Sequence, residues 1–344
     1  RITRGYCRTS CSALFFETDF SRLFQKREEN ELKKALIYGI LASFFFAFTF
    51  ILNRSMNLAG GYWMWAASLR YLFTFPILWI MLAGSPSAGR VWSAVKEAPV
   101  SWLVWSTVGF GLFYAPLTFG SVLGESWLAA ATWQLTIVAG VLLTPLFGKR
   151  IPIRNLGWSV LVLAGVFMMQ VPHLKRMEVR TVLFTLAPIL VAAFSYPLGN
   201  RKMMALCPAG MTTLERVYGM TLCSMPFWIF MSGWAWVKAG PAGRGQVFQS
   251  LCVALFSGVI ATILFFKATD LVKENPRHLA VIEATQCGEV VFTLLGGILL
   301  LKDRVPEPAG LAGIAVIVAG MVGNSLSAGK QCGESAVYPA DSRQ

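Results

Sequence analysis

The sequence predicts an all-α integral membrane protein with ten transmembrane helices arranged as two inverted five-helix repeats. Hydrophobic residues make up 56% of the 344 residues and only 14% are charged. The mean hydropathy is +0.59. These values exclude an ordinary soluble domain. The net charge of +13 lies mostly in loops and tails, where Lys and Arg orient a membrane protein, so it does not indicate nucleic-acid binding.

Ten apolar stretches have about the length that crosses a hydrocarbon core of about 30 Å. Short connections rich in Pro, Gly and charge separate them and leave no room for a soluble domain. The expected helices are residues 35–52, 63–82, 100–122, 127–147, 156–171, 181–198, 211–237, 248–266, 279–301 and 309–326.

The distribution of Lys and Arg predicts the orientation. The side that holds both termini collects 20 of these residues and the opposite side eight. Because cytosolic loops carry the excess of positive charge, we expect both termini in the cytosol and the protein in the plasma, or bacterial inner, membrane. Residues 1–34 are basic and unlike the rest, which fits either a cytosolic tail or a non-native extension.

The two halves of the chain carry the same motifs in the same order, which is the signature of an internal repeat. The pairs are Asn53-Arg54 with Asn200-Arg201, Arg70 with Arg216, Pro76 with Pro226, residues 149–152 with 303–306, and residues 162–165 with 317–320, at offsets of 146 to 155. Five helices in each repeat reverse the orientation of the second copy. We therefore expect repeats at 35–171 and 181–327, joined by a loop at 172–180 and followed by a tail at 328–344.

This arrangement resembles the drug/metabolite transporter superfamily with its paired EamA-like repeats, and within it most nearly the ten-helix multidrug-resistance efflux transporters. The resemblance covers about residues 35–327 and implies a secondary transporter that exports small organic molecules by alternating access. The four-helix small multidrug-resistance relatives use a glutamate in their first helix to take up protons and bind cationic drugs. The expected helices 35–52 and 181–198 contain no acidic residue, so a coupling carboxylate must come from elsewhere.

Glu283, Gln286 and Glu289 are the strongest candidates for a solute or coupling site. They fall within an arc of about 120° on one face of the expected helix 279–301. A carboxylate in a medium of low dielectric loses the hydration of its charged form, so such a group can exchange a proton near neutral pH. The alternatives are a structural ion pair with an arginine or, for Glu283, contact with water near the helix start.

Arg70 and Arg216 lie deep in apolar segments, where an unpaired cation costs at least about 2.5 kcal/mol. We expect them to pair with the glutamates or to recognise an anionic solute. Asn53 and Asn200 close their helices, as caps or as ligand contacts.

Three further residues lie inside apolar helices. Trp133 and Gln134 place an aromatic face beside an amide, which suits a planar or cationic solute or simple packing. Tyr114 precedes Pro116, where we expect a kink.

The sequence contains no enzyme signature, cofactor motif or metal-ligand cluster. The expected partners are a small-molecule substrate, the lipid bilayer, and protons or another coupling ion, with the chain as a monomer or a homodimer. An amino-acid or anionic-metabolite exporter or exchanger is the alternative within the class. A membrane-embedded transferase and a non-transporting scaffold are the rivals from other classes.

Overall fold

A computed structural model describes residues 9–83, 86–122, 125–148, 153–176, 179–272 and 275–337, and these residues form helices without a strand. The all-α fold class is confirmed. The elements are α1 (Thr9–Leu58), α2 (Trp63–Leu82), α3 (Ser87–Glu97), α4 (Pro99–Ser106), η1 (Thr107–Gly111), α5 (Leu112–Val122), α6 (Ser126–Trp133), α7 (Leu135–Leu142), η2 (Thr144–Phe147), α8 (Ile153–Arg176), α9 (Val179–Leu206), α10 (Thr213–Ala239), α11 (Arg244–Val253), η3 (Ala254–Ala261), α12 (Thr262–Val272), α13 (Pro276–Ala284), η4 (Thr285–Cys287), α14 (Gly288–Leu301) and α15 (Pro308–Val337).

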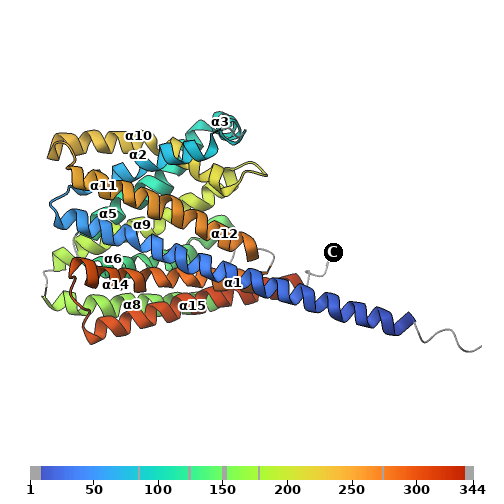
Figure 1. Cartoon of the computed structure of the whole chain (residues 1–344). Coiled ribbons are helices and arrows are strands. Elements are labelled where there is room, and N and C mark those ends of the chain that lie inside the picture. The colour runs from blue at the N-terminus through green and yellow to red at the C-terminus, as the bar shows by residue number, and fades with distance from the viewer. Residues whose placement is uncertain are drawn as a thin grey trace, which may run out of the picture.

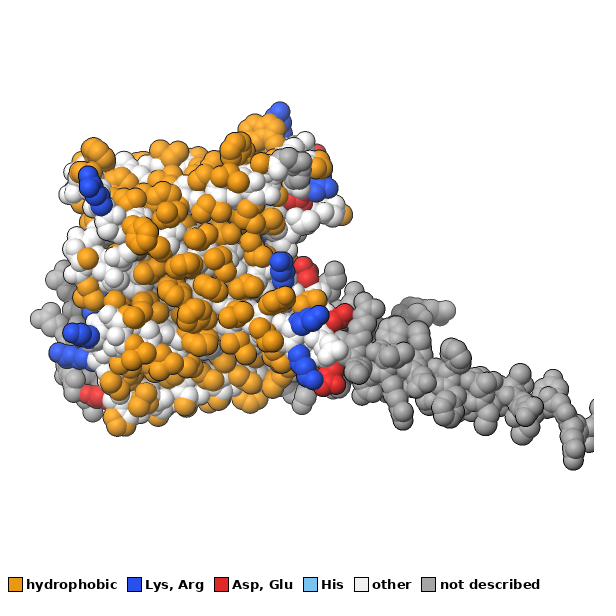
Figure 2. All heavy atoms as spheres, viewed as in Figure 1, with side chains coloured by type: hydrophobic (Ala, Val, Ile, Leu, Met, Phe, Trp, Pro, Cys, Tyr) orange, Lys and Arg blue, Asp and Glu red, His pale blue; other side chains and the backbone are white. Residues whose placement is uncertain are grey.

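The surface of the bundle is that of a membrane protein. Figure 2 shows a broad apolar belt with charged side chains gathered at its two edges. Such a belt is favourable only against lipid. Among the described residues, five helical segments are long and apolar enough to span a membrane: Glu29–Leu58, Trp63–Leu82, Pro99–Val122, Arg244–Val272 and Val281–Leu301. Three shorter apolar helices accompany them, and the count of ten spans stays a prediction.

The two termini leave the same end of the bundle (Figure 1). We call this the terminal end, and the opposite end, which carries the connections 59–62, 240–243 and 302–307, the far end. Two of the far-end connections are hydrogen-bonded to the starts of neighbouring helices: Trp65 of α2 donates to the Gly240 carbonyl, and Gln246 of α11 donates to the Tyr62 carbonyl. The cytosolic location of the terminal end stays a prediction.

Four of the expected helices are interrupted, and the interruptions recur at matching places in the two halves. The third expected helix contains the π-helical turn η1, and the eighth contains η3, also π-helical. The fourth breaks at Gln134 between α6 and α7, and the ninth breaks at the 3-10 turn η4. Pro116 lies just after η1, where a kink was expected. Because no proline lies in or near η3, proline alone does not explain the widened turns.

Helices α8 and α15 pack closely through glycines, in a reciprocal contact. A Cβ added at Gly165 would lie 2.7 Å from the Gly313 carbonyl oxygen, and one at Gly320 would lie 2.7 Å from a Val162 methyl. The last helix presents Gly313, Gly320 and Gly323 to its neighbour, whereas Ala315 and Ala319 are exposed.

Gly165→Ala should destabilise the protein, because its new methyl group meets backbone atoms that cannot move aside. Overpacking of this kind costs about 1–3 kcal/mol. Gly157→Ala on the same helix is the matched control, since nothing lies within 4 Å of a Cβ there and alanine favours the helix. Thermal unfolding in detergent should show a lower midpoint for Gly165→Ala only; equal midpoints would contradict the packing.

The amphipathic helix α3 was not expected, since the stretch between the second and third apolar segments is short and polar. It forms because Val91 and Ala94 bury one face and because Arg90 forms an ion pair with Glu215. Glu215 also completes a capping box with Thr212 at the start of α10. Glu215 is thus paired with Arg90 of α3, which precedes α10 in the chain.

Candidate functional site

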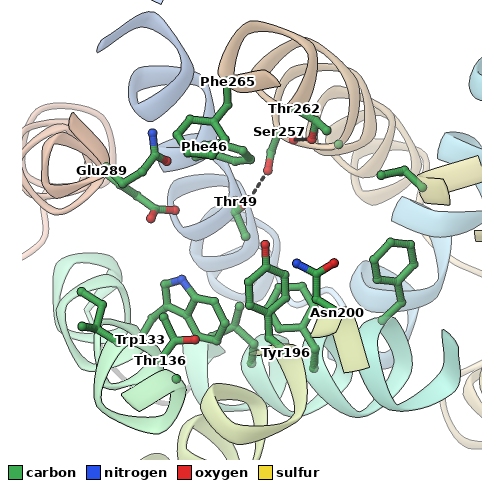
Figure 3. Close-up of a pocket in the computed structure, with 18 of the residues that line it drawn as sticks. Phe46, Thr49, Trp133, Thr136, Tyr196, Asn200, Ser257, Thr262, Phe265 and Glu289 are labelled. Carbon is green, nitrogen blue, oxygen red and sulfur yellow. Dashed lines mark hydrogen bonds between the residues drawn. The ribbon is translucent and has the colours of Figure 1, made fainter. Parts of the chain in front are cut away.

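A cavity of about 670 Å³ lies at the centre of the bundle. Its lining residues run from the middle of the helices toward the terminal end, and the described connections of the far end contribute none. Figure 3 shows side chains from both halves converging on it, with Glu289 facing Trp133 and Tyr196. The volume falls in the range of about 300–1,000 Å³ that is typical of small-molecule sites.

Glu289 forms the acidic part of the wall. It begins α14 directly after the break at η4, and only 9% of the residue is exposed. Gln134, whose Nε2 donates to the Ala130 carbonyl at 3.2 Å, lies close to this carboxylate, and Arg70 is close enough for a longer-range attraction. Glu283, on the preceding helix α13, is exposed to the cavity nearer the terminal end.

Arg70 is held by neutral groups rather than by a carboxylate. Its guanidinium donates to the Thr49 hydroxyl at 3.1 Å and to the Ser257 hydroxyl at 3.2 Å. The Tyr114 ring centre lies 4.2 Å from the guanidinium carbon. In the described part of the chain, Glu289 has no arginine within 4 Å, so the expected Arg–Glu ion pair is wrong. Hydroxyls and an aromatic face stabilise this cation instead.

Arg216 also lines the cavity, but its surroundings differ. Its Nε atom is buried and has no hydrogen-bond partner among the described residues, and the same is true of Gln286 Nε2. Both atoms are obligatory donors, and a buried donor without an acceptor costs about 1–3 kcal/mol. Two of the residues that line the cavity, Arg216 and Gln286, therefore each carry one buried donor that lacks an acceptor among the described residues.

An aromatic cluster forms the opposite wall. The ring centres of Phe113 and Trp133 lie 5.0 Å apart, those of Phe113 and Tyr196 4.9 Å, and those of Trp133 and Tyr196 5.7 Å. All three residues line the cavity. Such a wall offers apolar and π-facing contacts to an organic solute.

Eight of the ten residues singled out in the sequence line this one cavity, namely Glu283, Gln286, Glu289, Gln134, Trp133, Arg70, Arg216 and Asn200. The other two lie just behind its wall. Asn53 Nδ2 donates to the Tyr114 hydroxyl at 3.2 Å, and the Tyr114 ring supports Arg70.

Sequence reasoning missed several lining residues: Thr49, Ser257, Tyr71, Tyr196 and Arg201. Of these, Arg201 alone had a signal, because it follows Asn200 in the repeated Asn-Arg motif. A single hydroxyl or tyrosine in an apolar helix does not differ from ordinary packing residues.

A cluster of polar contacts, which we call the far-end clasp, closes the bundle on the other side of the cavity. The buried Asp303 carboxylate accepts hydrogen bonds from the Ser126 N–H at 3.0 Å and the Ser126 hydroxyl at 2.6 Å. It also forms an ion pair with Arg54 Nε at 3.7 Å. Arg54 and Asn57 donate to the Val122 carbonyl. The clasp thus joins the end of α1 to the connections that follow α5 and α14.

The described residues of this region do not form a metal-binding site. Within the described ranges, no group of three or more His, Cys, Asp or Glu side chains is arranged to hold an ion.

Comparisons with known proteins agree with this architecture. The EmrE family model, described as "Putative multidrug resistance efflux transporter", matches residues 33–330. The uncharacterized protein YjlA of Bacillus subtilis (strain 168) is 46% identical over 302 residues, covering 84% of this chain and 93% of YjlA.

A second relative is an uncharacterized 42.1 kDa protein of Shouchella clausii, encoded in the 3′ region of an intracellular alkaline protease. It is 45% identical over 266 residues, covering 74% of this chain and 70% of that protein. A solved crystal structure with 16% identity superposes with a TM-score of 0.51, over 87% of this chain and 99% of its own, and shows likeness of fold alone.

Proposed function

Because the chain belongs to the EmrE family of multidrug resistance efflux transporters, we propose that its central cavity binds small organic molecules and exports them by alternating access. The observation that carries the proposal is the cavity itself, which combines a buried carboxylate, the polar side chains of Arg216 and Gln286, and an aromatic wall. It extends toward the terminal end and is closed by the clasp at the far end. With the terminal end in the cytosol of the plasma membrane, this is a state that loads solute from the cell interior.

The two inverted repeats would allow the protein to switch between a state open to one side of the membrane and a state open to the other. Matching breaks in the fourth and ninth expected helices, and matching π-helical turns in the third and eighth, support the assignment of repeats to 35–171 and 181–327. Inverted repeats can exchange their conformations, so that a site between them opens alternately to either side. The cavity is built from residues of both repeats, as this mechanism requires.

Coupling to protons is assigned to Glu289. The carboxylate is buried and lacks an ion-pair partner among the described residues, a setting in which a carboxyl group readily takes up and releases a proton. The first and sixth expected helices contain no acidic residue, so Glu289 takes over the role that a first-helix glutamate has in the four-helix relatives.

The test is transport by the full chain in liposomes. We expect accumulation of labelled tetraphenylphosphonium, or of a labelled metabolite from a mixed panel, when a proton gradient is imposed across the membrane. A sodium gradient of equal size is the comparison, and protein-free liposomes are the blank. If folded protein moved no solute under either gradient, the carrier function would be refuted.

A further inference from the structure

Two neighbouring cations at the terminal end are not neutralised by a carboxylate of the described residues. Arg201 and Lys202 lie in the last two turns of α9. The Arg201 guanidinium carbon lies 5.6 Å from the Phe147 ring centre, and the Lys202 ammonium nitrogen lies 5.4 Å from the same ring centre. Neither residue takes part in an ion pair with a described residue. Because two like charges are held at one aromatic ring, this position attracts an anion.

Lys202 is also held by a second aromatic ring. Its ammonium nitrogen lies 5.4 Å from the Trp105 ring centre. Trp105 belongs to α4 and Phe147 ends η2, so the two rings come from different elements and lie about one α9 side chain. We call Arg201, Lys202, Trp105 and Phe147 the basic-aromatic cluster.

The depth of the cluster is that of the lipid headgroups. Phe147 is the last residue of one expected span, and Arg201 lies three residues beyond the end of another, 181–198. Charged side chains gather at this level, at the edge of the apolar belt (Figure 2). Trp, Lys and Arg are enriched at the same level in membrane proteins because the headgroup region accommodates both ring and charge.

The cluster belongs to one repeat only. Arg54, the counterpart of Arg201, is neutralised by Asp303 at the far end. The other three positions, Lys202, Trp105 and Phe147, correspond to Ser55, Cys252 and Leu301 at offsets of 147, 147 and 154 residues. The far end thus has neither the second cation nor the two rings. A role in holding the repeat together would require the same residues in both copies, so the cluster has a purpose specific to the terminal end.

Apolar side chains that are exposed on the same elements indicate what kind of anion fits. Leu142 of α7, Leu146 of η2 and Met204 of α9 are all exposed. Lys202 is half-exposed and does not line the central cavity. A soluble anion would contact the cations and leave this apolar surface uncovered. A phospholipid covers both, because its phosphate lies at the depth of the cations and its acyl chains lie along the belt.

We propose that the basic-aromatic cluster is a binding site for the headgroup of an anionic phospholipid, with the phosphate between Arg201 and Lys202 and the acyl chains against Leu142 and Leu146. Basic sites between transmembrane helices on the cytosolic side suit such headgroups. The inference concerns the outer surface of the bundle and does not rest on the proposed export function, so either can fail without the other.

The experiment measures lipid binding to the full chain in detergent by native mass spectrometry. The two probes, dioleoylphosphatidylglycerol and dioleoylphosphatidylcholine, share their acyl chains and differ in net charge. We expect the first phosphatidylglycerol to bind about tenfold more tightly than the first phosphatidylcholine, as two cations beside one anionic headgroup imply. The preference should shrink in Lys202→Gln, vanish in the double variant Arg201→Gln with Lys202→Gln, and persist in Lys202→Arg, which keeps the charge.

Lys238→Gln is the matched control. Lys238 also lies over a tryptophan, 5.7 Å from the Trp234 ring centre, but it is near the far end and shares this ring with no second cation of the described residues. Its lipid preference should equal that of the parent, and thermal unfolding checks that each variant is folded. Equal affinity of the parent for the two lipids, or an undiminished preference in the double variant, would overturn the proposal. Displacement of phosphatidylglycerol by an excess of glycerol 3-phosphate would also overturn it, since the site would then take a soluble anion.

Discussion

Glu289→Gln is expected to abolish proton-driven transport while leaving the protein folded. The glutamine side chain has nearly the same shape and can keep the contact with Gln134, but it cannot exchange a proton. Transport in liposomes should then lose its response to an imposed pH gradient and fall to the level of protein-free vesicles. In the parent, the rate should rise when the far side of the membrane is made more acidic, since protons then enter down their gradient and drive efflux.

Two controls separate this role from a general effect of charge. Glu97→Gln removes a carboxylate that is exposed on α3 and does not line the cavity, so its pH response should equal that of the parent. Glu283→Gln tests the second carboxylate of the cavity, which is more accessible and should change the response less. If Glu289→Gln and Glu283→Gln both kept the full pH response, the coupling assignment would be wrong.

Asp303→Asn is expected to release the far-end clasp and to open the bundle on that side. The substitution removes the charge that attracts Arg54 and weakens the hydrogen bonds from Ser126. Charge-assisted hydrogen bonds contribute about 1.5–3 kcal/mol each, and about 1.4 kcal/mol changes an equilibrium tenfold. We therefore expect the far-end-open population to rise by about tenfold or more.

Thiol labelling measures this population. Ser121 is fully buried near the far end of α5, so a Ser121→Cys reporter, placed in a chain whose native cysteines are replaced by serine, should react slowly with an impermeant reagent added to the far side. Asp303→Asn should accelerate labelling by about the factor given above. Asp270→Asn makes the same change at an exposed site near the terminal end and should leave the rate unchanged. Equal rates in all three chains would show that Asp303 does not hold the far end closed.

Among the described residues, no counterpart of the clasp is present at the terminal end, toward which the cavity extends. Arg201 corresponds to Arg54 in the repeat, and Lys149 corresponds to Asp303. Lys149 lies outside the described residues. The Arg201 guanidinium instead lies 5.6 Å from the Phe147 ring centre, and Arg201 lines the cavity. The asymmetry favours the state with a closed far end.

Much of the fold could be predicted because hydropathy and repetition are properties of the chain itself. Every apolar stretch identified in the sequence overlaps helical elements, and α2 has the predicted bounds of 63–82. The helix α3 was missed because only Val91 and Ala94 among its side chains are buried. Two buried residues are too few to produce a recognisable helical periodicity of apolar positions in the sequence. The turns η1, η3 and η4 were missed because a local change in helical hydrogen bonding leaves no distinctive composition.

The candidate site also has some features that the sequence predicted and others that only the structure revealed. The rarity of charged and amide side chains in apolar helices was enough to identify Glu289, Gln134, Arg70 and Arg216, since the cost of burying such groups makes each one informative. Their partners could not be found in this way. The Arg–Glu pairing expected from charge was wrong, because the fold brings Thr49 and Ser257 to Arg70, from helices more than 200 residues apart in the sequence.

The sequence by itself determined the membrane class and the residues around which a site could form, and it predicts two related halves, because these follow from the hydrophobicity and order of side chains along the chain. Only the tertiary structure decided which of two equivalent arginines is satisfied, that Asp303 belongs to the clasp, and toward which end the cavity extends. Each of these depends on distances between helices, and a helix's sequence does not specify the neighbours against which it packs.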